Sequence, residues 1–113
     1  SLNMLWYIYD LIRFTIKKGE AMAKIFVVDQ EHQASVKAFK VSQEHEADIC
    51  VFVVKQEHEA RDDAKWYYVK QAHQASTKLF WVSQAYQADL KVYFVTQEHQ
   101  AKWKKGHSLQ NRL

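Results

Sequence analysis

A glutamine recurs every 13 residues along most of this chain, and an alanine follows four residues after each copy. The copies are Gln30, Gln43, Gln56, Gln71, Gln84 and Gln97. One longer step of 15 residues separates the third glutamine from the fourth. A unit this short cannot bury its own apolar side, so neighbouring units must supply the core. The repeat therefore constrains the architecture more tightly than the activity.

Each unit divides into an apolar half and a polar half. The first half is a run of β-branched and aromatic residues, such as KIFVV, CVFVV or KWYYV, which favours a strand. Both faces of these strands are mostly apolar, which is typical of a sheet covered on both sides. The second half, such as QEHQAS, predicts a helix of two turns or less, capped in three copies by Asp29, Ser42 and Ser83.

These units predict an α/β fold, in which six βα repeats close into a ring or small barrel with the short helices outside. Equal repeats without distinct end units favour closure. Connections of about seven or eight residues are short for parallel crossovers, so antiparallel strands with helical corners are the alternative. The glutamines are expected to tie backbone groups of neighbouring units together. The residue after each alanine is expected to face solvent.

The sequence also has a longer period of 41 residues, which contains three of the short repeats. Ser35 matches Ser76, and Asp48 matches Asp89, so the first three repeats resemble the last three in detail. The extra residues around Asp62 fall at the seam between the two halves. The chain is therefore predicted to be a duplicated three-unit module with a pseudo-twofold axis.

The second half is richer in aromatic residues than the first. Val27, Lys40 and Val53 in the first half become Tyr68, Trp81 and Phe94 in the second. We expect one side of the ring to be aromatic and to form an interaction surface. The residues predicted to carry it are Trp66, Tyr68, Trp81, Phe94 and Trp6.

The chain is predicted to have three parts. Residues 1–21 lie outside the repeat and are expected to dock on the ring, residues 22–103 form the six-repeat domain, and residues 104–113 form a flexible C-terminal tail. The apolar run at residues 5–16 is shorter than the roughly 20 residues that cross a bilayer, so no membrane association is predicted. The repeat array opens cleanly at Met22, which suggests the hypothesis that Met22 is the native start.

The units resemble those of small, mainly bacterial repeat proteins of unknown function, built from K-V-Y-x-V-x-S-x-Y-x-A-D copies. The match covers residues 24–103, and histidine mostly replaces the second tyrosine, which only Tyr86 keeps. The resemblance supports the repeat interpretation and implies no activity.

The regular histidines invite a metal-binding interpretation. Equivalent positions hold His32, His45, His58, His73 and His99. Zinc needs about four ligands that converge on one point, whereas a ring of equivalent positions spreads its members apart. A position that accepts histidine or tyrosine is better explained as a flat, half-buried side chain, with His32 leaning toward Val36. No metal or other cofactor is therefore predicted.

The net charge and the cysteine content limit the functional classes and the cellular compartment that the chain could have. The net charge of +3 is mild, and a strongly basic nucleic-acid binder is not indicated. Lysines recur at the start of most repeats, as Lys24, Lys37, Lys65, Lys78 and Lys91. They are expected to form a solvated rim that meets carboxylates. The single cysteine, Cys50, is predicted to be inert packing in a reducing, cytoplasmic protein.

The sequence thus predicts a non-enzymatic structural or protein-interaction module, with a protein partner or self-association. A metal- or anion-binding ring that uses the repeated histidines or lysines is the alternative. No nucleophile with its base, phosphate loop or carboxylate pair is recognisable, so an enzyme is not predicted.

Overall fold

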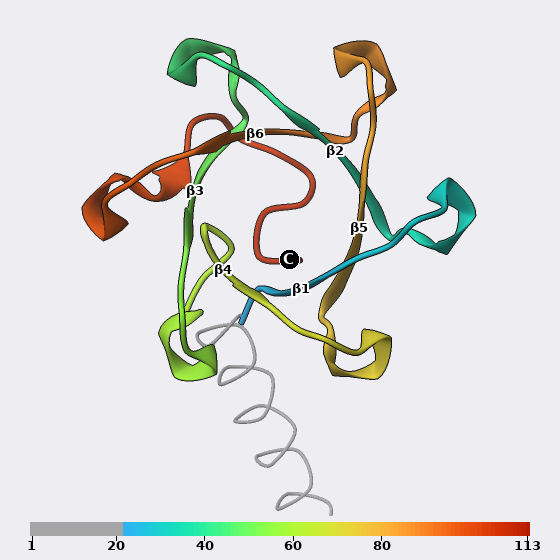
Figure 1. The fold of residues 1–113 in the computed structure, drawn as a ribbon. Coiled ribbons are helices and arrows are strands. Elements are labelled where there is room, and N and C mark those ends of the chain that lie inside the picture. Colours follow the sequence, from blue (N-terminus) through green and yellow to red (C-terminus); the bar gives the residue numbers. More distant parts are fainter. Residues whose placement is uncertain (1–21) are drawn as a thin grey trace, which may run out of the picture.

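The strands of the repeats form a closed parallel barrel (Figure 1). The computed structural model describes residues 22–113. Its strands are β1 (Lys24–Val27), β2 (Val36–Lys40), β3 (Ile49–Val53), β4 (Lys65–Tyr68), β5 (Thr77–Trp81), β6 (Leu90–Phe94) and β7 (Lys102–Trp103). Strands β1 to β6 are parallel to their neighbours, and the short β7 runs antiparallel to β3. The predicted closure of the repeats into a ring is confirmed.

The two halves of the duplication interleave around this barrel. The order is β4, β1, β5, β2, β6, β3, and a further pairing between β3 and β4 closes the ring. On its first circuit the chain therefore places β1, β2 and β3 at alternate positions around the ring. On the second circuit β4 lies between β3 and β1, β5 between β1 and β2, and β6 between β2 and β3. Consecutive repeats are not neighbours, apart from β3 and β4 at the seam.

The parallel arrangement makes the antiparallel alternative wrong. Strands of four or five residues span only about 13–17 Å, so a short excursion brings the chain back to the same end of the barrel. The segment at residues 28–35, for example, joins β1 to β2 while β5 lies between them. A full crossover helix is unnecessary at this strand length.

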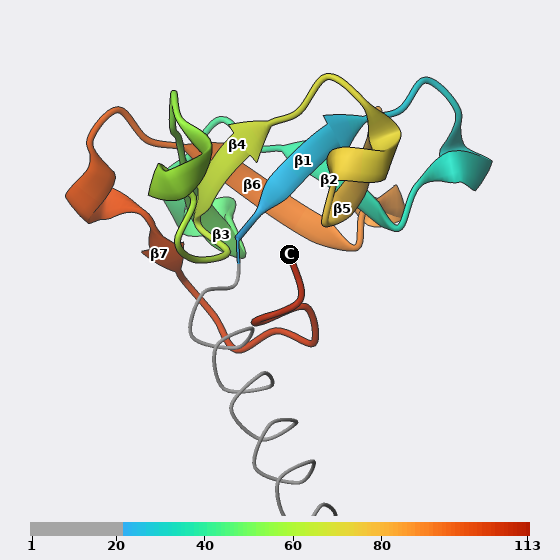
Figure 2. The same cartoon turned by 90° about the horizontal axis from the view of Figure 1, so that it is seen from below.

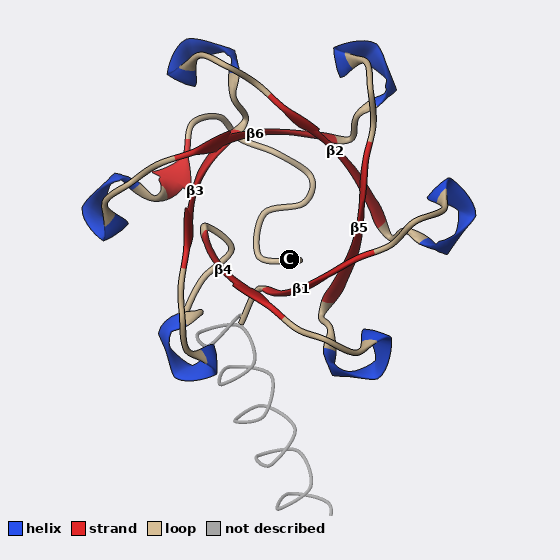
Figure 3. Ribbon diagram, viewed as in Figure 1, coloured by secondary structure: helices blue, strands red, loops and turns tan. Residues whose placement is uncertain are grey.

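The polar halves form tight corners and not the predicted α-helices (Figure 3). Each corner is a three-residue 3-10 helix: Glu31–Gln33, Glu44–Glu46, Glu57–Glu59, Ala72–Gln74, Ala85–Gln87 and Glu98–Gln100. In the first corner Gln30 and Ala34 both adopt extended backbone angles, which leaves room for one turn only. Helices this short are unstable without packing, and the predicted caps at Asp29, Ser42 and Ser83 are not used, since the glutamine occupies the N-cap position.

Neighbouring units are tied together by the residue after the corner alanine. Ser35 accepts a hydrogen bond from the Lys78 backbone N–H at 3.0 Å, and Asp48 accepts one from the Lys91 N–H at 2.9 Å. Ser76 and Asp89 repeat these contacts in the other half. Ser35, Ser76 and Asp89 are exposed, as expected for the residue after the alanine. Each nevertheless satisfies a backbone donor on an adjacent strand, a role that the sequence did not predict.

The glutamines do not provide such ties. All six are exposed, and within residues 22–113 no glutamine side chain bonds to a neighbouring unit. Their backbone carbonyls instead accept the N–H three residues on and close the corner, as Gln30 does for Gln33 at 3.1 Å.

Inward-pointing side chains fill the barrel in layers, because alternate residues of each strand face its interior. The lower layer consists of Ala23, Val36, Ile49, Ala64, Thr77 and Leu90, all buried. The middle layer consists of Ile25, Ala38, Val51, Trp66, Leu79 and Val92, all buried. The middle layer is the apolar strand face recognised in the sequence. A third layer lies at the carboxyl ends of the strands.

The C-terminal segment closes the lower mouth of the barrel (Figure 2). Leu113 is 3% exposed and packs with the barrel core, and Leu109 lies partly buried against it. His107 stacks on Trp103 with ring centroids 5.5 Å apart. The prediction of a flexible tail is wrong, because these apolar groups cover the lower layer.

The seam residue Asp63 anchors this segment. Its side chain is buried and accepts hydrogen bonds from the Trp103 indole at 3.1 Å, from the Leu113 N–H at 3.2 Å and from the Asn111 N–H. Asn111 takes a left-handed backbone, φ 66°, which asparagine tolerates. The extra residues at the seam therefore join the two halves to the closing segment.

Proposals about residues 1–21, including their docking, lie outside the described residues. Within the described residues, no helix is long and apolar enough to cross a membrane.

Replacing Asp63 should weaken the attachment of the C-terminal segment to the lower mouth of the barrel. Asp63→Ala leaves the buried Leu113 N–H, the part-buried Asn111 N–H and the Trp103 indole N–H without their acceptor. We expect it to lower the free energy of unfolding by about 2–3 kcal/mol. The measurement is equilibrium unfolding in urea. The matched control is Asp62→Ala, which loses an acceptor for Ala64 on an exposed side chain. Equal destabilisation by the two variants would contradict the anchoring role.

Candidate functional site

The third layer of side chains forms a rim around the upper mouth of the barrel. Each strand ends in one rim residue, and in ring order these are Val27, Trp81, Lys40, Phe94, Val53 and Tyr68. None is buried, and Val27, Val53 and Tyr68 are 41%, 41% and 38% exposed. The rim is an apolar surface in contact with solvent.

Three rim aromatics rest on a buried tryptophan from the middle layer. The ring of Trp66 lies 5.9 Å from Phe94, 6.4 Å from Trp81 and 6.5 Å from Tyr68, between centroids. Trp81 and Phe94 also contact each other at 5.8 Å. Two of the contacts to Trp66, those of Tyr68 and Phe94, are edge-to-face, which aromatic pairs favour. Trp66 itself is held from below, because its indole N–H donates to the Asp63 carbonyl at 2.7 Å.

These rings shape a pocket, which we call the cup. Its volume is about 440 Å³, and it is lined by Phe39, Lys40, Tyr68, Trp81, Val82 and Phe94. Small-molecule and side-chain pockets commonly fall in this size range. The cup is therefore large enough to receive a bulky side chain or a small organic group.

The structure brings together four of the five residues predicted to form an interaction surface. Tyr68, Trp81 and Phe94 line the cup. Trp66 is buried in contact with their rings. The expectation of one aromatic side of the ring is wrong, because the interleaved strands alternate the residues of the two halves around the rim. The fifth residue, Trp6, lies outside the described residues.

Lys40 is the charged member of the rim. Its Nζ lies 5.6 Å from the centroid of the Phe94 ring, in cation–π contact. Sequence analysis noted this position but did not select it. The available signal was a lysine at an inward-facing position where every other copy carries an apolar residue.

Burial raises the pKa of the Tyr68 phenol. A phenolate would lose hydration beside the neighbouring aromatic rings, so the neutral form is favoured. Tyr68 therefore offers the cup an uncharged hydroxyl at neutral pH.

The repeated histidines do not gather at any site. Those at equivalent corner positions are all exposed at the outer tips, and Tyr86, their counterpart in the fifth repeat, is 84% exposed. The expectation of half-buried packing against the following strand is wrong, since the 3-10 corner projects outward. Within residues 22–113, no group of three or more histidine, cysteine, aspartate or glutamate side chains is arranged to hold a metal ion.

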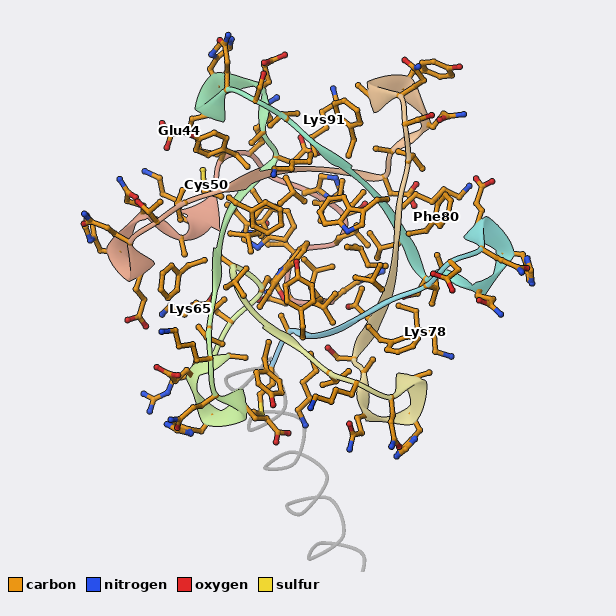
Figure 4. All side chains as sticks on the ribbon, viewed as in Figure 1. Glu44, Cys50, Lys65, Lys78, Phe80 and Lys91 are labelled. Atoms are coloured by element: carbon orange, nitrogen blue, oxygen red, sulfur yellow. The ribbon has the colours of Figure 1, made fainter. Side chains whose placement is uncertain are left out.

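The repeated lysines, among them Lys65, Lys78 and Lys91, lie on the outer side of the ring (Figure 4). Several of the repeated lysines pair with carboxylates. Lys24 pairs with Glu57 and Lys65 with Glu98, two contacts related by the duplication. Lys37 pairs with Glu31 at 3.0 Å, and the hydrogen bond and charge of that glutamate raise the pKa of Lys37. Exposed pairs of this kind contribute about 0–1 kcal/mol each.

Cys50 replaces the lysine of the other copies and is buried on β3. Its thiol donates weakly to the Glu44 carboxylate at 3.7 Å. Burial, with the Glu44 charge, raises the pKa of the thiol. The protonated thiol is a poor nucleophile at neutral pH.

Residues 22–104 match the model of the 7(1) septoil knot domain. No curated protein and no solved structure matches.

The raised pKa of Tyr68 predicts how stability depends on alkaline pH. Unfolded Tyr68 ionises near its ordinary value of about 10, while folded Tyr68 holds its proton to higher pH. The unfolded state then binds fewer protons, so the free energy of unfolding falls as pH rises above about 10. Absorbance titration at alkaline pH, compared with Tyr68→Phe, should show one phenol with a raised midpoint. A titration difference centred at or below pH 10 would contradict the partial shielding of this phenol from water.

Proposed function

The chain belongs to the 7(1) septoil knot domain family, and on this premise we propose that it is a non-enzymatic module that contacts a protein through its rim. The partner is either another protein or a second copy of this chain. The exposed aromatic and aliphatic residues of the rim, gathered over Trp66, carry the proposal.

The composition of the rim supports a protein contact. Interface hot spots are enriched in tryptophan and tyrosine that cluster at a well-packed centre. Trp81 and Tyr68 occupy such a centre, and Val27 and Val53 extend the apolar area on either side of Tyr68 in ring order. Exposed apolar groups gathered at one place mark interaction sites more often than isolated ones do.

The support beneath the rim favours binding without rearrangement. Trp66 is 0% exposed and touches three rim rings from below, while its indole is bonded to the seam. Side chains held in this way lose little conformational entropy when a partner docks. A preformed contact surface is what a structural module needs.

The chemistry of the remaining side chains supports a non-enzymatic role. The Cys50 thiol is protonated and buried, and the corner histidines lie apart from one another. The metal- or anion-binding ring stays a prediction from the repeats. We also propose a cytoplasmic protein, for which the unpaired buried thiol is the support; the bacterial origin and the particular repeat family likewise stay predictions.

Charges placed on the rim should abolish the contact. The double variant Val27→Asp/Val53→Asp puts two carboxylates at exposed strand ends without altering the core. We expect it to lose the proteins captured from an extract of the native host, and any self-association measured by sedimentation velocity, since desolvating a carboxylate at an apolar interface is costly.

The matched control is Tyr86→Asp, which makes the same kind of change at a corner tip. It should retain what the wild type binds, and circular dichroism should show that both variants are folded. Binding that survives in the rim variant, or that disappears only in Tyr86→Asp, would contradict a contact through the rim. Capture with residues 1–21 present and absent would show separately whether that segment contributes.

A further inference from the structure

The cup combines aromatic walls with a single positive charge. Its lining contains Lys40 and no carboxylate. In ring order Lys40 lies between Trp81 and Phe94, the two residues whose rings contact each other. A group that packs on these rings therefore lies beside an ammonium.

The Lys40 ammonium keeps its charge available. Lys24, Lys37 and Lys65 each pair with a carboxylate, whereas among the described residues Lys40 has no such partner. It rests instead on the Phe94 ring. The side chain is exposed, so an incoming carboxylate can reach it without displacing an existing ion pair.

The surroundings of the upper mouth add to this charge. Two positions beyond the rim residues of β3 and β4, the chain carries Lys55 and Lys70, against Asp29 at the same position after β1. Two corner carboxylates pair instead with lysines at the start of strands, Glu57 with Lys24 and Glu98 with Lys65. At the rim and two positions beyond it, three lysines therefore stand against one aspartate, which favours an anionic partner.

We infer that the cup receives a partner's protein segment that presents an aromatic side chain next to a carboxylate. The aromatic side chain packs on Trp81 and Phe94 above Trp66, and the carboxylate pairs with the Lys40 ammonium. This inference rests on the proposed function and deepens it, because it assigns the chemistry that the rim selects.

A protein segment fits the cup better than a nucleic acid does. Single-stranded nucleic acids are bound by grooves in which several bases stack in succession along a basic track. Here Tyr68, Trp81 and Phe94 line one pocket above the buried Trp66, and one lysine lines it with them. This shape accepts one side chain and its neighbour.

Three short peptides with blocked ends test the inference. The binding of each is monitored through the amide chemical shifts of the full chain at low salt. The first contains Phe-Glu, the second Phe-Gln and the third Ala-Glu. We expect the Phe-Glu peptide to shift the amides of Lys40, Trp81 and Phe94. The Ala-Glu peptide should bind much more weakly. An exposed ion pair changes affinity by roughly 0.2–1 kcal/mol, so Phe-Glu should bind about 1.4- to fivefold more tightly than Phe-Gln.

Lys40→Gln gives the matched control, because it removes the charge at an exposed strand end. In this variant the preference for Phe-Glu over Phe-Gln should disappear. A preference that persists in Lys40→Gln would overturn the inference. Equal affinity of the wild type for the two phenylalanine peptides would overturn it too, while leaving a purely apolar contact through the rim intact.

Two further results would also overturn it. One is the absence of any shift at the cup with all three peptides. The other is tighter binding of a short oligothymidylate than of the Phe-Glu peptide, which would point to a nucleic acid. The capture experiment with Val27→Asp/Val53→Asp judges the proposed function independently of these outcomes.

Discussion

Strand pairing between the two halves of the duplication is the constraint on which the rest of the structure depends. Within the described residues, each pairing of β1, β2 or β3 is with a strand of the second half or with β7, and never with another of the three. A half by itself would expose every backbone edge of its strands, which is unfavourable. The barrel therefore closes only when the strands of the second half have paired between those of the first. The description of the family as a knot agrees with such a path.

This interleaving also creates the candidate site. Because the halves alternate around the ring, the three aromatic rim residues of the second half are separated by Val27, Lys40 and Val53 of the first. The aromatic rings still meet, since they are long enough to lean inward over Trp66. Two halves lying side by side would place the lysine away from the rings. The combination of charge and aromatic walls is thus a product of the chain path.

The sequence was informative about features that each repeat determines locally. It was less informative about features that depend on the path of the chain around the barrel. The strands, the buried face through Ile25 and Trp66, the duplication and closure were predictable from period and composition. The interleaved order was not, because the repeat is the same whether the next strand lies one or two places along the ring. The corners were misjudged as helices, since QEHQA has helical residues but too few of them. The anchoring by Asp63 and the role of Lys40 involve partners distant in sequence, so no local pattern indicates them.

The order of strands around the barrel tests this account most directly. Nuclear Overhauser contacts between backbone protons report neighbouring strands, which lie about 4.8 Å apart. We predict contacts between Phe26 on β1 and Lys78 on β5, and between Lys37 on β2 and Phe80 on β5, as the register requires. Contacts that instead join β1 directly to β2, and β2 to β3, would show a ring of consecutive repeats and contradict the interleaved barrel.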